Sequence, residues 1–375
     1  MDYGLTEEQK SIISTAREIA QKHIKPVRQR YDAEEIFPWD IVKVLGEAGL
    51  FGVYIPEEYG GKGMGVFELV LVVEELSRVD AGIALCLAGT ALGAYPILLG
   101  GSDEQKKKWL PPLARGEKLA AFALTEAEAG SDATAIQTTA QRDGDEYVLN
   151  GTKCFITNGG DAEIYSVMAV TDKRKGARGI SAFVVEKGTP GFEFGKKENK
   201  MGIRASSTRE LIFQDCRVPR ANLLSLEGMG LILALKTFDA TRPGVAAQAL
   251  GIAAGALDEA LAFTTTTTVD GETLASHQAV QHILADLATE VEAARALLYA
   301  TSRMIDKGAK RTTKESAMSK LYASDVAMKV TSTVVRLFGH RGCLTDYPVE
   351  KMMRDAKITQ IYEGTNQIQR NEIAL

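Results

Sequence analysis

The stretch DAKITQIYEGTNQIQ, Asp355–Gln369, places a glutamate and a glycine between two segments that both suit a helix. Pro348 supplies a first helical turn, and apolar residues then recur at helical spacing. Gly364 is expected to end this helix in a left-handed conformation, with Glu363 at the helix's negative end. An ionised carboxylate is disfavoured there, which predicts a raised pKa and a better base. For a lone glutamate, an ordinary surface position at a helix end is the competing interpretation.

Long amphipathic segments precede this stretch. They span residues 232–263, 278–307 and 313–338, and a fourth runs from Pro348 to Tyr362. Four long helices with short links predict a bundle, and we assign it to a C-terminal domain of residues 226–375.

The pattern differs in residues 118–225, where short β-branched and aromatic runs alternate with turn residues. This region predicts a small antiparallel barrel or sandwich, with two hairpins between Ile136 and Thr157. Residues 1–117 return to helical patterns, beginning with a capping box of Thr6 and Gln9. The fold class is therefore multidomain α+β: an all-α domain, a β domain and a helical bundle.

Composition narrows the class of protein. The chain has 375 residues, 45% of them hydrophobic, and a formal net charge of -5, which predicts a soluble protein that does not bind nucleic acid. Its four cysteines form no Cys-x-x-Cys pair and are expected to be reduced, packed thiols, and no metal site is expected. The uncharged stretch Ala81–Ser102 predicts a buried helix rather than a membrane span, because Ala and Gly dominate it. The first ten residues lack signal-peptide features, so the cytoplasm is the expected location.

Two glycine-rich and serine-rich stretches are candidates for chemistry. There is no glycine-rich dinucleotide fingerprint and no G-x-S-x-G pentapeptide. What remains is ALTEAEAGSDA, Ala123–Ala133, and CFITNGG, Cys154–Gly160, each a strand end that leads into a polar loop. Such loops present free backbone N–H groups and hydroxyls, although each alone is also compatible with a plain turn.

Five stretches taken together resemble one family along the whole chain. They are LTEAEAGSDA (124–133), FITNGG (155–160), MGIRASSTREL (201–211), FDATRPGVAAQALGIA (238–253) and YPVEKMMRDAKITQIYEGTNQIQ (347–369). In this order they resemble the acyl-CoA dehydrogenases, and most closely the short-chain and medium-chain branch.

The resemblance implies an FAD-dependent enzyme of acyl-CoA metabolism, such as β-oxidation, that converts an acyl-CoA to the trans-2-enoyl-CoA. FAD would lie between the β domain and the bundle, electrons would pass to an electron-transferring flavoprotein, and the usual assembly is a homotetramer. Glu363 resembles the base that removes the α-proton, and its own backbone N–H resembles a donor to the thioester carbonyl. The acyl group is expected to be a short to medium chain or a compact ring.

Further roles follow from the same resemblance, position by position. Cofactor contacts are implied for Phe122, Leu124, Thr125, Ser131, Phe155, Ile156, Thr157, Gln278, Arg336, His340, Thr365 and Gln367. Substrate contacts are implied for Ser131, Asp239, Arg242, Tyr362 and Gly364, with a surface ion pair as the alternative interpretation of Arg242.

The chain departs from the family pattern at two places where a neighbouring subunit reaches FAD. Arg-x-Gln-Phe-Gly is replaced at Thr267–Gly271, and Gln-x-x-Gly-Gly-x-Gly at Arg336–Gly342. One hypothesis is a homo-oligomeric enzyme in which Arg336, His340 or Arg341 supplies the missing charge. The alternatives are one subunit of a hetero-oligomer, an enoyl-CoA reductase running in reverse, and a flavin-free acyl-CoA-binding or assembly subunit.

Overall fold

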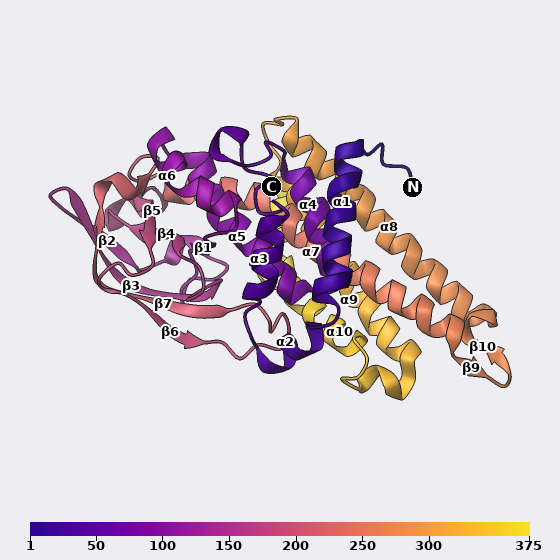
Figure 1. The fold of residues 1–375 in the computed structure, drawn as a ribbon. Helices are drawn as coiled ribbons and strands as arrows, with labels where there is room; N and C mark the ends of the chain where they lie inside the picture. Colours follow the sequence, from indigo (N-terminus) through magenta and orange to yellow (C-terminus); the bar gives the residue numbers. More distant parts are fainter.

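The computed structural model describes residues 1–375, and its N-terminal part is helical (Figure 1). The helices are α1 (Glu7–Ile19), α2 (Arg28–Glu34), α3 (Trp39–Glu47), α4 (Val66–Ser77), α5 (Ala81–Gly100) and α6 (Asp103–Ala114). The predicted capping box is confirmed: the Gln9 N–H donates to Thr6 Oγ1 at 3.2 Å, and the Thr6 N–H donates to Gln9 Oε1 at 3.0 Å.

Helix α5 is the core of this part of the molecule. Asp80 caps it by accepting a hydrogen bond from the Ile83 N–H at 2.8 Å. By length and composition α5 and the later helix α7 (Gly230–Thr266) are both able to cross a membrane, but 78% and 72% of their most apolar stretches are buried inside the protein. The predicted buried helix is thus confirmed for α5, which packs between α4 and the sheet.

The middle part is one eight-stranded sheet. Its strands are β1 (Ala120–Ala123), β2 (Thr139–Asp143), β3 (Glu146–Thr157), β4 (Ile164–Val170), β5 (Ile180–Glu186), β6 (Phe192–Lys197), β7 (Thr208–Pro219) and β8 (Leu223–Leu224). The order is β6-β7-β3-β2-β4-β5-β8, and β1 pairs with β4 in parallel. Most pairs are antiparallel as predicted, but β1–β4 and the single β2–β4 bridge are not.

The prediction of two hairpins between Ile136 and Thr157 is wrong, because only the β2–β3 hairpin forms there. Gly151 lies inside β3, at a shift in the β3–β7 register. A Cβ on Gly151 would lie 2.4 Å from Thr138 Oγ1, so the glycine permits close packing within the sheet.

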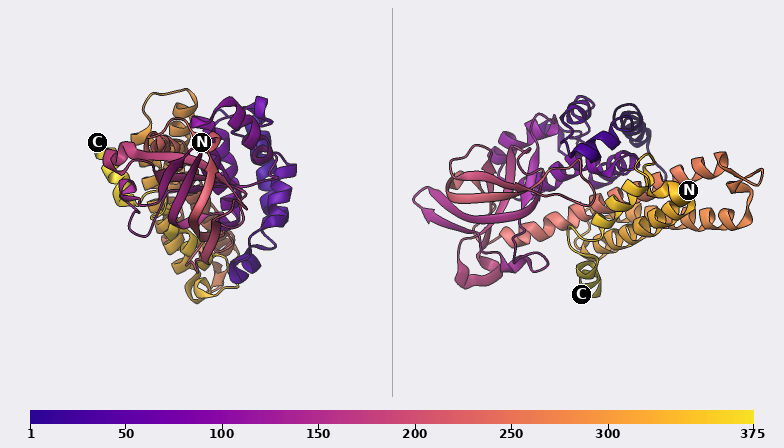
Figure 2. Two further views of the ribbon diagram at one scale, coloured as in Figure 1. Left: turned by 90° about the vertical axis from the view of Figure 1, so that its left-hand side faces the viewer. Right: turned by 90° about the horizontal axis from the view of Figure 1, so that it is seen from below.

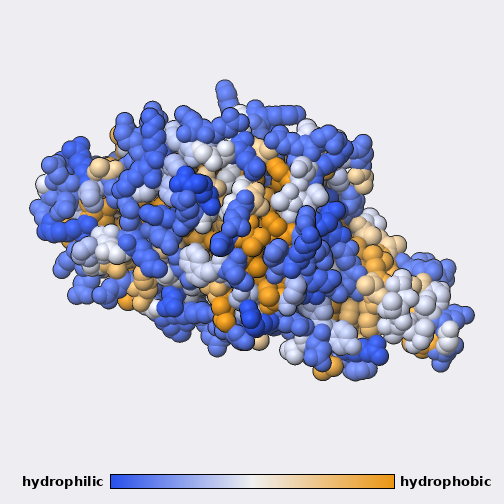
Figure 3. All heavy atoms as spheres, in the orientation of Figure 1, coloured by the Kyte–Doolittle hydropathy of each residue, from blue (hydrophilic) through white to orange (hydrophobic).

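The C-terminal part is a bundle. Its helices are α7 (Gly230–Thr266), α8 (Gln278–Asp306), α9 (Thr313–Phe338), α10 (Val349–Thr359) and α11 (Asn366–Ala374). A small hairpin of β9 (Thr268–Val269) and β10 (Glu272–Thr273) joins α7 to α8. Figures 1 and 2 show this hairpin at the end of the bundle remote from the sheet, while α11 projects from the side. In Figure 3, apolar atoms show on the protruding part of the bundle, between its hydrophilic tip and the N-terminal helices.

Two expectations about the C-terminal part need correction. Helix α10 ends at Thr359 instead of continuing to Tyr362, because Gln360 turns the chain: its carbonyl accepts from the Asn366 N–H at 2.9 Å. Gly364 therefore follows a turn and does not directly cap the helix. Cys343 is exposed, whereas the other three cysteines are buried as expected.

A buried ionic cluster joins the three parts of the chain at α10. Lys351 Nζ lies 2.5 Å from Asp355 Oδ2 and 2.9 Å from Asp80 Oδ2. Asp355 Oδ1 also accepts from the Ile203 N–H at 2.5 Å. Because all three side chains are almost fully buried, each charge depends on the others for compensation.

Replacement of Lys351 by Met is expected to destabilise the protein by about 3–5 kcal/mol, because it leaves Asp80 and Asp355 buried without a cation. Urea-induced unfolding followed by circular dichroism measures the change. Lys357→Met, at an exposed position on the same helix, is the control and should shift stability by less than about 0.5 kcal/mol. Equal midpoints for the two variants would contradict this role of the cluster.

Candidate active site

The turn between α10 and α11 has an uncommon backbone conformation. Glu363 has a φ of 50° and Gly364 a φ of 89°, so two successive residues are left-handed. A glutamate rarely adopts this conformation, and surrounding contacts must hold it. Thr365 then caps α11 by accepting a hydrogen bond from the Ile368 N–H at 3.3 Å.

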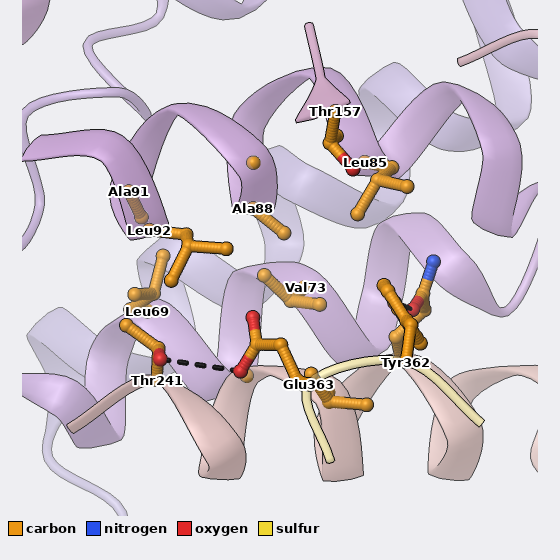
Figure 4. Close-up of a pocket in the computed structure, with 14 residues that line it drawn as sticks. Leu69, Val73, Leu85, Ala88, Ala91, Leu92, Thr157, Thr241, Tyr362 and Glu363 are labelled. Atoms are coloured by element: carbon orange, nitrogen blue, oxygen red, sulfur yellow. Dashed lines mark hydrogen bonds between the residues drawn. The ribbon is translucent and has the colours of Figure 1, made fainter. Parts of the chain in front are cut away.

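Glu363 faces a narrow pocket (Figure 4). The walls come from helices α4, α5 and α7, together with one residue of β3 and the α10–α11 turn. The lining residues are Leu69, Val73, Leu85, Ala88, Gly89, Ala91, Leu92, Thr157, Thr241, Gly244, Val245, Gln248, Tyr362 and Glu363. Most of this surface is apolar, so the Glu363 carboxylate has few polar neighbours.

Burial raises the pKa of Glu363 to about 7. A hydrogen bond from Thr241 Oγ1 to Glu363 Oε2, 3.2 Å long, opposes this rise, as do the positive charges of Arg242 and Lys320. The predicted direction is confirmed, but the predicted cause is wrong: the pKa rises through burial, and the helix ends at Thr359, before the turn that carries Glu363.

Arg242 is buried, with 3% of its surface exposed, so the interpretation as a surface ion pair is wrong. Its Nη2 lies 3.5 Å from Glu372 Oε1, while Nε and Nη1 have no hydrogen-bond partner in the chain. Buried donors of this kind normally have partners, which points to an oxygen-rich ligand. Nearby, Asp239 Oδ2 accepts from Thr313 Oγ1 at 2.8 Å.

The two predicted flavin-facing loops lie side by side. The Cys154 N–H donates to the Thr125 carbonyl at 2.9 Å, which joins the loop after β1 to the end of β3. Phe122, in β1, packs edge-on against Phe238 of α7 with ring centroids 5.5 Å apart. This contact brings the β domain against the bundle.

The other residues predicted from these loops differ in exposure. Leu124 and Ile156 are buried, whereas Ser131 is exposed. Phe155 is 63% exposed and has a φ of 57°, so an aromatic ring faces solvent on a strained backbone.

These residues fit FAD. Thr157 of the β domain and Glu363 of the bundle line the same pocket. Phe155 offers an uncovered aromatic face of the kind that packs on a planar ring system. The start of α11, with Thr365 and the exposed Gln367, suits a nucleotide phosphate.

Other predicted cofactor residues lie elsewhere in the chain. Gln278, Arg336 and His340 are exposed and line no part of this pocket. Phe338 stacks on Phe263 with ring centroids 4.0 Å apart, which places the end of α9 beside the end of α7 that carries the hairpin. Within one chain, the pocket residues therefore lie together, whereas Gln278, Arg336 and His340 lie outside the pocket.

Sequence reasoning missed Thr241 and Lys320, both of which contact the Glu363 turn. Lys320 Nζ donates to the Gly364 carbonyl at 2.8 Å and is fully buried. Helical spacing carried a signal for it, because Ser316, Ala323 and Ala327 place Lys320 on the buried face of α9.

The order of a helical domain, a sheet and a helical bundle around this pocket defines a flavoprotein class. Family models described as the N-terminal, middle and C-terminal domains of acyl-CoA dehydrogenase match residues 6–117, 121–216 and 228–375. The chain therefore belongs to the acyl-CoA dehydrogenase family and is an FAD-dependent oxidoreductase.

Individual proteins agree with this assignment. A chain in a solved structure of the electron transferring flavoprotein of Acidaminococcus fermentans is 50% identical, with a TM-score of 0.98, over 100% of this chain and 98% of that one. Butyryl-CoA dehydrogenase from Megasphaera elsdenii is 46% identical, with a TM-score of 0.97, over 100% and 99%. Acryloyl-CoA reductase (NADH) from Anaerotignum propionicum is 47% identical over 100% and 95%.

The raised pKa of Glu363 predicts a pH dependence. A base must be ionised, and with a pKa of about 7 the ionised fraction rises as the pH increases through 7. We expect kcat/KM to increase about tenfold between pH 6 and pH 8 with a midpoint near 7. Steady-state rates with butyryl-CoA across this range measure it, and a rate that is constant or falls with pH would contradict the assignment.

Proposed function

We propose that this enzyme oxidises a short-chain or medium-chain acyl-CoA to the trans-2-enoyl-CoA, with Glu363 as the base. The observation that carries this proposal is the Glu363 carboxylate, which faces an apolar pocket shared with Thr157 of the cofactor-facing strand. A weakly acidic α-proton requires a desolvated carboxylate of raised pKa, and Glu363 has both properties.

In the proposed reaction the α-proton moves from the substrate to a carboxylate oxygen of Glu363, while FAD supplies the acceptor for the β-hydride. The Glu363 N–H makes no hydrogen bond within the chain and is available to the thioester carbonyl. The unpartnered N–H groups of Arg242 are available to oxygens of the CoA arm, beside Asp239. Apolar walls from α4 and α5 exclude water from the reacting carbons.

The pocket supports a short to medium acyl chain or a compact ring. Its apolar wall is interrupted by Gln248 and Tyr362, whose hydroxyl donates to Gln248 Oε1. Passing a long alkyl chain through this pair would leave buried polar groups without partners. The similarity to butyryl-CoA dehydrogenase supports the same size range.

A second candidate function is reduction of an enoyl-CoA. Acryloyl-CoA reductase (NADH) is 47% identical to this chain. A carboxyl group with a pKa of about 7 is populated in both forms near neutral pH, so Glu363 is able to accept or to donate the α-proton.

Glu363→Gln tests the proposal. The amide cannot accept the proton, so we expect kcat to fall by about 100-fold to 10,000-fold while FAD remains bound. Turnover of butyryl-CoA with an artificial electron acceptor, and the flavin absorbance of the same samples, measure both effects. A variant that oxidises acyl-CoA at a near-normal rate would remove Glu363 from this role.

We further propose a cytoplasmic homotetramer that uses an electron-transferring flavoprotein. Exposed apolar side chains on the bundle and hairpin support an oligomer. These residues are Leu261, Val269, Tyr322, Leu344 and Ile361. The solvent-facing positions of Gln278, Arg336 and His340 support their contact with FAD of a neighbouring subunit.

The protein purified alone is expected to contain one FAD per chain in a tetramer, because Arg336, His340 or Arg341 replaces the missing family arginine. The visible spectrum and light scattering measure both quantities. Less than one FAD per chain, not restored by added FAD, would favour the hetero-oligomeric or flavin-free alternatives.

A further inference from the structure

The Glu363 turn rests on helix α9 through one buried cation. Lys320 Nζ donates to the Gly364 carbonyl at 2.8 Å and to Asn366 Oδ1 at 2.9 Å. No carboxylate forms a salt bridge with Lys320, although the side chain is fully buried. Its ammonium therefore contacts the turn and its first helical residue rather than a counter-ion.

Neighbouring side chains complete this support. Asn366 Nδ2 donates to Ser324 Oγ at 2.9 Å and to Asp325 Oδ1 at 2.8 Å, which ties the turn to the next turn of α9. Gln369 Nε2 donates to the carbonyls of Glu363 and Gly364 at 3.1 and 2.9 Å. Each carbonyl of the two left-handed residues is thus held by a side chain.

Burying a lysine costs free energy because its charge must be desolvated, and an apolar side chain of similar length would pack there without this cost. Two successive left-handed residues, by contrast, persist only where contacts hold them. Lys320 provides such a contact, because its Nζ group donates to the carbonyl of Gly364, the residue that follows Glu363.

We propose that Lys320 is a positioning residue for the base: its Nζ group holds the Glu363–Gly364 turn by hydrogen bonds so that the Glu363 carboxylate faces the pocket. The inference rests on the proposed role of Glu363. It assigns Lys320 a part in the reaction without contact to substrate or cofactor.

The charge of Lys320 has a second effect on the same turn. Burial lowers the pKa of Lys320 to about 7; Glu363 and Asp325 favour its charged form, while Arg242 opposes it. In return, the ammonium lowers the pKa of Glu363. Removing the charge therefore raises the pKa of Glu363 further, so a higher pH is needed to ionise the base.

Lys320→Met is the test, with Lys329→Met as the control, because Lys329 is exposed on the same helix and pairs only at the surface with Glu290. We expect Lys320→Met to lower kcat about 10-fold to 100-fold, since a small misplacement of a reacting group has an effect of this size. KM should change less than about threefold, and the acid limb of the kcat/KM profile should move to higher pH. Lys329→Met should match the wild type in all three.

The inference is overturned if the acid limb stays at the wild-type midpoint, even when kcat falls, because a purely structural role predicts that result. If Lys320→Met does not fold, as judged by circular dichroism and flavin content, Lys320→Gln replaces it. This variant keeps the two N–H donors of an amide NH2 group without the charge and should retain more of kcat while still moving the acid limb. If neither variant folds, the inference is also overturned. Lys320 would then be required for folding, whereas the inference assigns it only to the position of the Glu363 turn.

Glu363→Gln, measured in parallel, separates the two proposals. If the Glu363→Gln variant is active, Glu363 is not the base, and both proposals fail. An inactive Glu363→Gln variant beside a Lys320→Met variant with wild-type rate and profile would leave the base in place and remove only the role of Lys320.

Discussion

The burial of one carboxylate is the constraint on which the site depends. Glu363 has an ordinary glutamate side chain, and its pKa of about 7 comes from the apolar walls that α4, α5 and α7 place around it. Those walls belong to different parts of the chain, so the base acquires its property only when the N-terminal helices pack on the bundle. The packing of the domains therefore also sets the pKa of Glu363.

Placing that carboxylate requires rigid support on two sides. The Lys351 cluster fixes α10 against Asp80 of the N-terminal part and the Ile203 N–H of the middle part. Lys320 and Gln369 then fix the left-handed turn that follows. Because each group is held by hydrogen bonds or charge pairs rather than by packing alone, the turn has little freedom to rotate Glu363 away from the pocket.

The sequence predicted what depends on local patterns. Helix α5, the helices of the bundle and the capping box at Thr6 follow from periodicity and end residues. The predictions from sequence were wrong where contacts between residues distant in the chain determine the structure. Helix α10 ends early because Gln360 forms hydrogen bonds with Asn366 and Asp325. Arg242 is buried by packing that the spacing of residues in the sequence does not reveal. The family resemblance identified Glu363 as the base, but the cause of its raised pKa became clear only from the structure of the pocket.

The central claim is that Glu363 removes the α-proton, and proton exchange measures this step without the rest of the reaction. Acetyl-CoA has α-protons but no β-carbon, so in D₂O the enzyme can only exchange them. Nuclear magnetic resonance of acetyl-CoA with the FAD-loaded protein should show exchange that rises with pH through a midpoint near 7, as the pKa of Glu363 requires. Glu363→Gln should abolish it. Equal exchange by the wild type and Glu363→Gln would contradict the account.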